Sequence, residues 1–529
     1  MNSRTLYSTS VAFAVALGGF LMGFDSAVIS GVVDPIRGRF ELEPAELGWA
    51  VSCLTLGSTI AMAFAGPAAD RFGRRAVLFV TALLFTLSAV GSALAPDYLT
   101  LVIARIVGGF GVGGALLIAP VFIAEIAPPE QRGRLVSFNQ LNIVLGFSAA
   151  FFSNYFLNGY FERQEGDWSD VAWRWMLGVE TVPALLYFAL LLLVPRSPRW
   201  LAMRGRDEEA LAVLARANGP ERAAAALADV HASIRRSREM GRVTLSEVLQ
   251  RRMRRVLVIG LGLGFFQQAT GINAIFYYCT TIFSMAGAGR GAALSQAIWV
   301  GIVNVAFTIV AMWLIERLGR RPLLIVGTAV MSLALFTNAW LFSTATYRLD
   351  PDPSTASIQI EDVVSPESVA ALTPLAGQVF PSQAAFVDAL VERAAAASEA
   401  VGTEVADKAA ELAKKALQLD GTLVLIAIMA YIAAFAISLG PVMWAMFSEI
   451  FPMRLRGVAI SMAGFFNSAV SWSVQQLFPT GLDVLGPGGV FAVFGGFAAL
   501  GLVFTLFVVP ETKGRTLEEL EAELIPEEA

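Results

Sequence analysis

The chain contains one histidine, His231, among its 529 residues, and only two cysteines, Cys53 and Cys279, each inside an apolar run. A single histidine argues against metal sites and proton relays built from imidazoles. Two separated cysteines indicate neither a disulfide framework nor a thiolate metal site. Charged residues are also scarce, at 15% of the chain, whereas soluble domains carry about 25%. This deficit indicates a protein that faces lipid, and neither a metal nor a cofactor is expected.

Apolar runs that are long enough to cross a bilayer fill most of the chain. A transmembrane helix needs about 20 such residues to span the hydrocarbon core. Twelve runs meet this length, at 9–31, 45–67, 76–95, 99–124, 135–157, 173–194, 256–283, 292–314, 322–343, 421–447, 457–479 and 487–509. The sequence therefore predicts an all-α membrane protein with twelve transmembrane helices.

Three short phrases occur twice, in the same order. The pairs are Gly66–Arg75 (G-P-A-A-D-R-F-G-R-R) with Trp313–Arg321 (W-L-I-E-R-L-G-R-R), Glu125–Gly133 with Glu449–Gly457, and Pro195–Leu201 with Pro510–Leu517. Such a repeat predicts two pseudo-symmetric six-helix halves, which is the architecture of secondary transporters. The predicted divisions are an N-terminal half at 1–195, a linker of short helices at 196–255 and a C-terminal half at 256–529.

The distribution of Lys and Arg predicts the orientation. With the N-terminus in the cytoplasm, the loops that carry Arg71, Arg132, Arg317 and Arg454 all fall on the cytoplasmic side, together with the Arg-rich linker. Two of the opposite loops, around 96–98 and 480–486, contain neither Lys nor Arg. We therefore expect a multi-pass protein of the cell inner membrane with both termini in the cytoplasm.

The second half contains an insertion. The acid of the basic loop and the glutamate of the second phrase are 55 positions apart in the first half, but 133 apart in the second, a difference of 78. The extra residues lie at about 344–420, between spans nine and ten, on the outer side. Phe386, Leu390, Val401, Val405 and Leu412 are spaced like one face of two helices. A solvated helical appendage is expected, and a lid over the outer vestibule is the alternative.

Each basic loop combines an acid, a glycine and two arginines. The glycine permits a tight turn between packed spans, and the acid can pair with an arginine of a neighbouring span. We expect a latch that holds the cytoplasmic side shut in one state. Arginines that only set topology are the alternative, but they leave the repeated acid and glycine unexplained. The expected gating residues are Asp70, Arg71, Gly73, Arg74, Glu125, Glu316, Arg320 and Glu449.

With these phrases the chain resembles the sugar porter family of the major facilitator superfamily, which includes bacterial proton–sugar symporters and animal facilitative glucose carriers. The resemblance is carried by Gly23–Gly31 (G-F-D-S-A-V-I-S-G), the basic loops, Glu125–Pro128, Pro195–Leu201, Gln267–Asn273, Gly440–Trp444 and Pro510–Arg515. It covers nearly the whole chain outside 344–420 and implies the major facilitator fold. The chain has Arg196 where the family usually has Glu, Glu316 where it usually has Asp, and Ser468 where many members have Trp.

Three ionisable residues lie deep within spans of the first half: Asp25, Arg105 and Glu180. The rise per residue places them at a similar depth, in the outer half of the bilayer, and such costly groups are functional by default. A guanidinium beside Asp25 favours the carboxylate, and one that turns to Glu180 lets Asp25 take a proton. We expect a proton switch, and a static ion cluster is the alternative. In the proton-coupled members that the chain resembles, an Asp matching Asp25 is the coupling site.

The spans of the second half carry amides and aromatic rings in place of charges. Amides both donate and accept hydrogen bonds, which suits a polyol, and a Trp face suits the C–H side of a sugar ring. Amides that only join helices are the alternative, and for Asn304 and Asn467 the two interpretations are left open. The candidate sugar-binding residues are Gln140, Gln267, Gln268, Asn273, Tyr278, Asn304, Trp444 and Asn467.

The sequence thus predicts a secondary active transporter, not an enzyme, that imports a neutral monosaccharide (a hexose, a pentose or a related polyol) by proton symport and alternating access. A facilitative uniporter is the first alternative and a sugar sensor the second. The expected partners are the sugar, protons and the lipid bilayer. Neither a nucleic acid nor a second subunit is expected, so the working form is a monomer.

Overall fold

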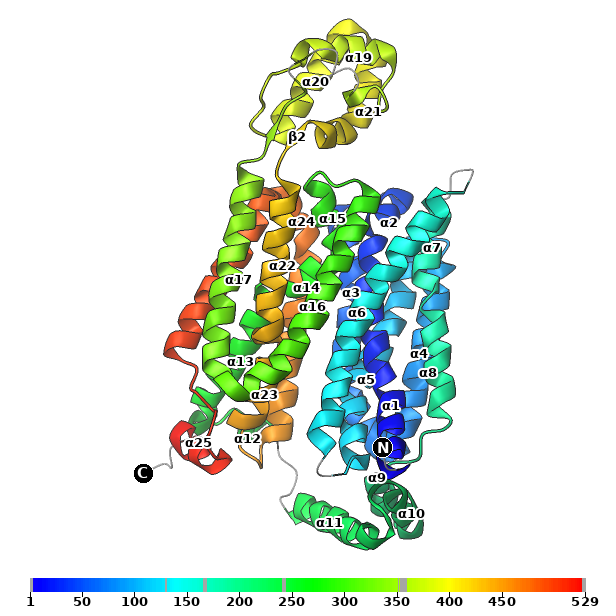
Figure 1. The fold of residues 1–529 in the computed structure, drawn as a ribbon, viewed down its shortest axis with the longest axis vertical. Coiled ribbons are helices and arrows are strands. Elements are labelled where there is room, and N and C mark those ends of the chain that lie inside the picture. Colours follow the sequence, from blue (N-terminus) through cyan, green and yellow to red (C-terminus); the bar gives the residue numbers. More distant parts are fainter. Residues whose placement is uncertain are drawn as a thin grey trace.

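The computed structural model describes residues 3–128, 131–164, 169–239, 244–350, 352 and 359–525. Long helices form the body, a group of short helices lies at one end, and a small helical unit stands at the other (Figure 1). Both termini lie at the end with the short helices. We call this end, which carries the linker residues 198–248, the linker face, and the opposite end the appendage face.

Six spans form the first half. They are α1 (Ser3–Val28), α3 (Pro44–Phe72), α4 (Arg74–Ala93), α5 (Tyr98–Ile126), α6 (Arg132–Glu162) and the pair α7 (Ser169–Gly178) and α8 (Thr181–Leu191). The short segments η1 (Ile29–Gly31) and α2 (Val33–Phe40) follow α1. Ten described segments are long and apolar enough to cross a membrane. The helix α6, which carries five amide side chains, is not among these ten, yet it runs the height of the body beside α1 (Figure 1).

Backbone contact explains how the polar helix α6 is held. A Cβ atom on Gly23 of α1 would lie 1.9 Å from the Ile143 carbonyl oxygen of α6. A Cβ atom on Gly146 of α6 would lie 2.0 Å from the Phe20 carbonyl oxygen of α1. Glycine at both positions lets the two backbones touch, which is the usual basis of helix association in lipid.

The second half has broken spans. It contains α13 (Arg254–Ala269), α14 (Ile272–Tyr277), α15 (Cys279–Met285), α16 (Arg290–Leu318), α17 (Arg320–Ser343), α22 (Gly421–Ile437), α23 (Leu439–Ile450) and α24 (Arg456–Phe507). Span seven breaks at Gly271, whose φ is +87°, and span ten breaks at Ser438. Pro441 follows the second break and cannot donate to the carbonyl of Ile437. The 52-residue helix α24 holds spans eleven and twelve, which meet at Gly486 with φ +68°.

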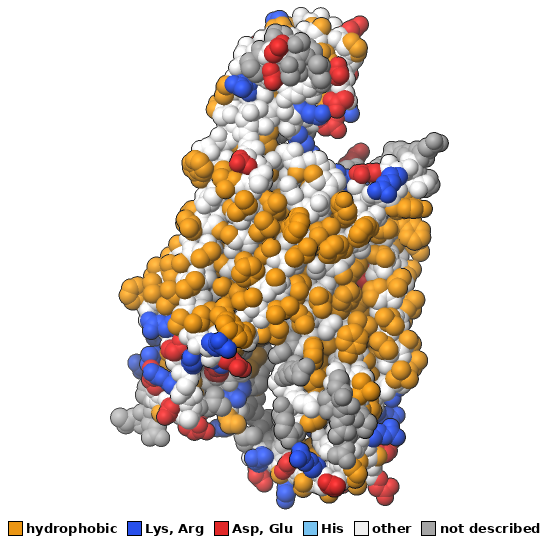
Figure 2. Space-filling model, viewed as in Figure 1, with side chains coloured by type: hydrophobic (Ala, Val, Ile, Leu, Met, Phe, Trp, Pro, Cys, Tyr) orange, Lys and Arg blue, Asp and Glu red, His pale blue; other side chains and the backbone are white. Residues whose placement is uncertain are grey.

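The surface agrees with a membrane-embedded body. In Figure 2 hydrophobic side chains cover the middle of the molecule, and charged side chains gather at the linker face and on the appendage. Exposed apolar side chains of the body include Leu193, Val326 and Phe507, at 79%, 56% and 83% exposure. Apolar surface on this scale needs a partner, and lipid provides it.

The linker forms short helices beneath the bundle (Figure 1). They are α9 (Pro198–Met203), α10 (Asp207–Asn218), α11 (Pro220–Glu239), α12 (Leu245–Val248) and η3 (Arg251–Met253), and α25 (Leu517–Leu524) lies at the same face. Arg454 joins the linker to the second half through a 2.7 Å ion pair with Glu247. The backbone N–H of Thr244 holds the pKa of the Glu247 carboxyl below its ordinary value, and Arg454 acts in the same direction.

The appendage has its own core. The strands β1 (Thr346–Tyr347) and β2 (Leu417–Gln418) pair antiparallel, so its two connections to the body run side by side. Above them stand α19 (Pro366–Leu372), η4 (Thr373–Leu375), α20 (Gln383–Ala397) and α21 (Glu399–Ala416). The five apolar residues expected on one face of two helices are all buried in this core. The Ser365 and Ser368 hydroxyls donate to Glu404 and lower its pKa, which fastens α19 to α21.

Candidate functional site

The three ionisable residues expected in the first half meet in one buried cluster. Asp25 on α1 and Arg105 on α5 form an ion pair, with 3.3 Å between Oδ1 and Nη1. Glu180 is within electrostatic reach of both. All three are at most 2% exposed, so water contributes little to their solvation. A buried charge cluster is stable only where its members compensate one another.

The cluster is only partly satisfied. Among the described residues, Asp25 Oδ2, Glu180 Oε1 and the Arg105 Nε and Nη2 atoms have no hydrogen-bond partner. Gly108 on α5 makes room for the carboxylate, since a Cβ atom there would lie 2.8 Å from Asp25 Oδ2. Glu180 lies between α7 and α8, where Pro183 cannot donate to the Val179 carbonyl. Arg105 is thus paired with Asp25, and Glu180 is a second carboxylate within its electrostatic reach.

The second half brings four of the expected amides into one network. Asn467 Nδ2 donates to Gln267 Oε1 at 2.8 Å, and Gln268 Nε2 donates to Gln267 Oε1 at 3.1 Å and Asn467 Oδ1 at 3.3 Å. Asn273 Nδ2 donates to Gln268 Oε1 at 3.0 Å and to Ser471 Oγ at 2.7 Å. The break at Gly271 lets Asn273, five residues after Gln268, turn back to it. The network therefore joins spans seven and eleven.

The members of the network are held in two different ways. Gln267 Nε2 also donates to the backbone carbonyl of Leu439, at the break in span ten, and Asn467 Nδ2 donates to that of Gly264. Gln268 and Asn273 are bonded only to other side chains among the described residues. Side-chain partners can rotate away, whereas backbone carbonyls cannot. Gln268 and Asn273 are thus held less firmly than Gln267 and Asn467.

The remaining four candidates lie outside this network. Gln140 on α6 and Trp444 on α23 are exposed, and the Trp444 ring packs edge-on against Phe447, 5.6 Å between centroids. Tyr278 is buried against Phe478, and its hydroxyl donates to the Gln475 carbonyl at 3.5 Å. Asn304 is buried on α16, and no hydrogen bond joins it to the other amides in the described chain.

Sequence reasoning missed a set of polar residues that connects the network to the first half. Gln475 Nε2 donates to Ser471 Oγ at 2.8 Å, and Thr55 Oγ1 on α3 donates to Gln475 Oε1 at 2.8 Å. Ser52 Oγ donates to Gln476 Oε1 at 2.8 Å. The adjacent amides Gln475 and Gln476 within an apolar span were a signal that could have been read. These bonds carry the amide network across the boundary between the halves.

The halves are joined on the side of the appendage face. Thr280 and Thr281, which follow span seven, donate to the Ser30 carbonyl and to Asp34 after span one. Trp49 on α3 packs edge-on against Trp472 on α24, with 6.5 Å between centroids. At the linker face, each ion pair of the expected gating residues lies within a single half, among the residues that the structure describes.

The repeated phrases form nearly the same latch in each half. Arg74 pairs with Glu125 at 3.2 Å, and Ser197 Oγ donates to Glu125 at 2.5 Å. In the second half Arg320 pairs with Glu449 at 2.6 Å, and Thr512 Oγ1 donates to Glu449 at 2.5 Å. The repetition of the sequence is therefore a repetition of geometry.

The other expected gating residues differ between the halves. Arg74 also pairs with Asp70 at 2.9 Å, while the equivalent Glu316 is exposed, without an ion-pair partner in the described chain. Arg71 lies over the Phe72 ring, and Gly73 has φ +97°, the left-handed region that the tight turn requires. As to metals, no group of three His, Cys, Asp or Glu side chains lies close enough together in the described residues to hold an ion.

Comparison with known proteins agrees with this geometry. The family described as "Sugar (and other) transporter" matches residues 11–355 and 401–524. The arabinose–proton symporter of Bacillus subtilis is 34% identical over 97% of this chain and 94% of its own. The D-xylose–proton symporter of Escherichia coli is 33% identical over 100% and 98%.

Solved structures are similar to this chain as well. The inward-open structure of the E. coli xylose transporter has a TM-score of 0.74 at 31% identity, covering 98% of this chain and 100% of that one. A structure of the proton:xylose symporter bound to 6-bromo-6-deoxy-D-glucose scores 0.69. The chain therefore belongs to the sugar transporter family, with the twelve-helix major facilitator fold.

Proposed function

We propose that this chain imports a neutral monosaccharide together with a proton, by alternating access. The observation that carries the proposal is the presence in one chain of a buried Asp25–Arg105–Glu180 cluster and an uncharged amide network. The named relatives carry arabinose and xylose, so pentoses are the first substrates to test. Because the network contains no charged side chain, an organic acid or amine has no counter-ion there.

The ion cluster provides the proton step. With Arg105 paired to Asp25, the carboxylate is ionised, which corresponds to the state after the proton has left toward the linker face. If Arg105 turns to Glu180, Asp25 loses its counter-ion and takes up a proton. The unpartnered oxygen of Glu180 and the unpartnered guanidinium nitrogens support this exchange, because no other described group competes for them.

The amide network provides the sugar step. Gln268 and Asn273 release their side-chain partners and bond the hydroxyls, while Gln267 and Asn467 stay fixed to backbone carbonyls. Thr55 and Gln475 extend the network to the first half, so a sugar that bonds the network contacts both halves. Gln140, Tyr278, Asn304 and Trp444 remain proposed contacts from the surrounding spans.

The linker face is proposed to be cytoplasmic in a cell inner membrane, because the Arg-rich segments lie there. Residues 1–195 and 256–529 rock as two units, with 196–255 joining them and 344–420 as an outer insertion. In the inward-open state each latch clamps its own half. When the linker face closes, the exposed Asp70 and Glu316 gain partners across the boundary. Both sites lie in one chain, so a monomer suffices.

Uptake by purified protein in proteoliposomes tests the proposal. Labelled xylose, arabinose and glucose are offered with and without an inward proton gradient, and the internal pH is followed with a dye. We expect one of these sugars to accumulate above its external concentration, with acidification of the lumen, and to lose that accumulation with a protonophore. Equilibration without accumulation, unaffected by the protonophore, would identify a uniporter.

A further inference from the structure

The two halves also differ beside their latches, at the N-termini of the helices α4 and α17. In the second half, Glu511 accepts hydrogen bonds from the backbone N–H groups of Arg320 and Arg321, each at 3.1 Å. These N–H groups begin α17, where a helix has unsatisfied donors and a partial positive charge. The Glu511 carboxylate therefore caps the helix and fixes the segment after span twelve to it.

In the first half an arginine occupies the equivalent place. Arg196 precedes Ser197 as Glu511 precedes Thr512, and Ser197 and Thr512 make the same bond to their glutamates. The helix α4 begins at Arg74, and no described side chain caps its N–H groups. The start of α4 thus lacks the carboxylate that its symmetry mate has, and a second positive charge stands in its place.

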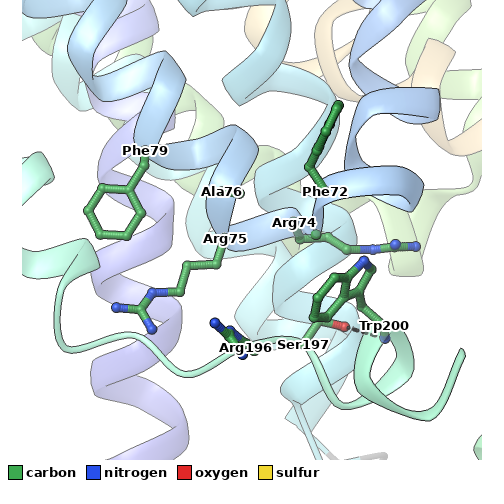
Figure 3. A pocket seen from close by; sticks show the side chains of 9 residues that line it. Phe72, Arg74, Arg75, Ala76, Phe79, Arg196, Ser197 and Trp200 are labelled. Carbon is green, nitrogen blue, oxygen red and sulfur yellow. Dashed lines mark hydrogen bonds between the residues drawn. The ribbon is translucent and has the colours of Figure 1, made fainter. Parts of the chain in front are cut away.

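A cavity lies at this point. Its volume is about 320 Å³, and Arg75 and Arg196 both line it (Figure 3). Arg75 donates through Nη2 to the Leu192 carbonyl at 3.0 Å. Its buried Nε, and the buried Nε1 of Trp200, have no hydrogen-bond partner among the described residues. Two like charges and two unused donors around one space leave a net demand for an anion.

We propose that this pocket binds an oxyanion, and specifically a phosphate group. Guanidinium groups and the N-terminus of a helix are the two protein features that bind phosphate best, and here they converge. The phosphate can come from the headgroup of an anionic lipid or from solution. The rim favours a lipid, because Phe72, which lines the pocket, and Leu192, whose carbonyl accepts from Arg75, are 61% and 59% exposed and can contact acyl chains.

The bound anion would take the place of the carboxylate that the first half lacks at Arg196. It would join α4 to the segment before α9, as Glu511 joins α17 to the segment after span twelve. Because Ser197 lines the cavity and donates to Glu125, the anion would also stabilise the first-half latch. In the second half the anion is the Glu511 carboxylate of the chain itself, whereas in the first half it would be a phosphate bound from the membrane or from solution.

The test compares wild type with Arg196→Glu, which supplies the missing carboxylate, and with Arg251→Glu. Arg251 is an exposed linker residue outside the pocket, so it matches the change in charge. Thermal unfolding of purified protein in detergent is followed while inorganic phosphate replaces chloride at constant ionic strength. We expect a saturable rise in midpoint for wild type and Arg251→Glu. Arg196→Glu should start from a higher midpoint and respond at least tenfold more weakly.

A second arm distinguishes the source of the phosphate. Native mass spectrometry counts phosphatidylglycerol or phosphatidylcholine retained after transfer from mixed micelles. Selective retention of phosphatidylglycerol that phosphate displaces, and that Arg196→Glu abolishes, assigns a lipid. A response to phosphate without such retention assigns the soluble anion. Equal responses of wild type and Arg196→Glu in both arms overturn the proposal, and Arg196→Gln replaces the Glu variant if that variant does not fold.

Discussion

The two halves of this chain share a scaffold but bury different chemistry. The first half buries Asp25, Arg105 and Glu180, while the described spans of the second half bury amides and hydroxyls at their centre. The latches at the linker face, Arg74–Glu125 and Arg320–Glu449, are nearly the same. The two halves therefore share the geometry of their latches at the linker face, but they differ in the residues that they bury at their centres.

The centres differ in backbone as well as in side chains. Asp25 and Arg105 lie on continuous helices, whereas the amide network is built around breaks at Gly271 and Ser438. An ion pair needs two groups at a fixed distance, which continuous helices provide. A site for several hydroxyls needs donors and acceptors pointing in several directions, and a broken helix supplies them.

Removal of the first-half charge should have the largest effect. Asp25→Asn leaves Arg105 without its partner and removes the group that carries the proton, so accumulation under a proton gradient should be abolished while sugar exchange persists. Uptake and counterflow in proteoliposomes measure the two activities. The exposed Asp483→Asn on α24 is the matched control. Accumulation by Asp25→Asn equal to wild type would falsify the assignment of coupling to this half.

A change in the second half should alter sugar affinity and leave coupling intact. Gln268→Ala leaves sugar hydroxyls without a partner and removes one of the two acceptors of Asn273, at about 1–3 kcal/mol, so affinity should fall roughly tenfold or more. Competition binding measures the affinity, and Gln296→Ala on α16, outside the network, is the control. Wild-type affinity in both Gln268→Ala and Trp444→Ala would place the sugar elsewhere.

The helix break can be tested apart from the amides. Gly271→Ala forces a side chain into φ +87°, with a Cβ atom only 2.4 Å from the Phe494 ring, and should cost about 1–3 kcal/mol of stability. The thermal midpoint should fall and sugar binding should weaken, although no ligand-bonding group has been removed. Gly457→Ala, which has open space around its Cβ, is the control. An unchanged midpoint would show that the break is not required.

Removal of the appendage should have the smallest effect on transport. Replacing residues 344–420 with a short Gly/Ser linker between Ser343 and Gly421 should leave membrane insertion and uptake unchanged, because the unit has its own core and its connections pair with each other. Expression and uptake are measured together. A variant that inserts normally but transports with altered selectivity would assign the appendage a role in transport, as a lid.

Much of the fold could be predicted from the sequence. Hydrophobic length predicted twelve spans, and the major facilitator fold implied by the family resemblance is confirmed by the comparisons. The expectation that Asp25, Arg105 and Glu180 share one depth agrees with their meeting in one cluster. The rise per residue of a helix and the free-energy cost of burying an ionisable side chain are local properties, so they can be read from the sequence.

Part of the site could not be predicted. The bonds from Ser52 and Thr55 to Gln476 and Gln475 join residues 424 and 420 positions apart, and no local pattern reports such a contact. The break at Ser438 was missed too, although Pro441, which cannot donate to the Ile437 carbonyl, is a local signal for it. Gln140 and Asn304 met the rule for a polar residue in a span, yet neither joins the network.

By itself, the sequence determined the number of spans, their duplication, the scarcity of buried charge and the absence of a carboxylate at Arg196, because each depends on residue type and spacing along the chain. Only the tertiary structure decided which amides bond to which, that the halves meet at the appendage face, and that Arg196 and Arg75 line one cavity. These depend on how helices far apart in the sequence pack. Packing energies are sums over many weak contacts that no single residue carries.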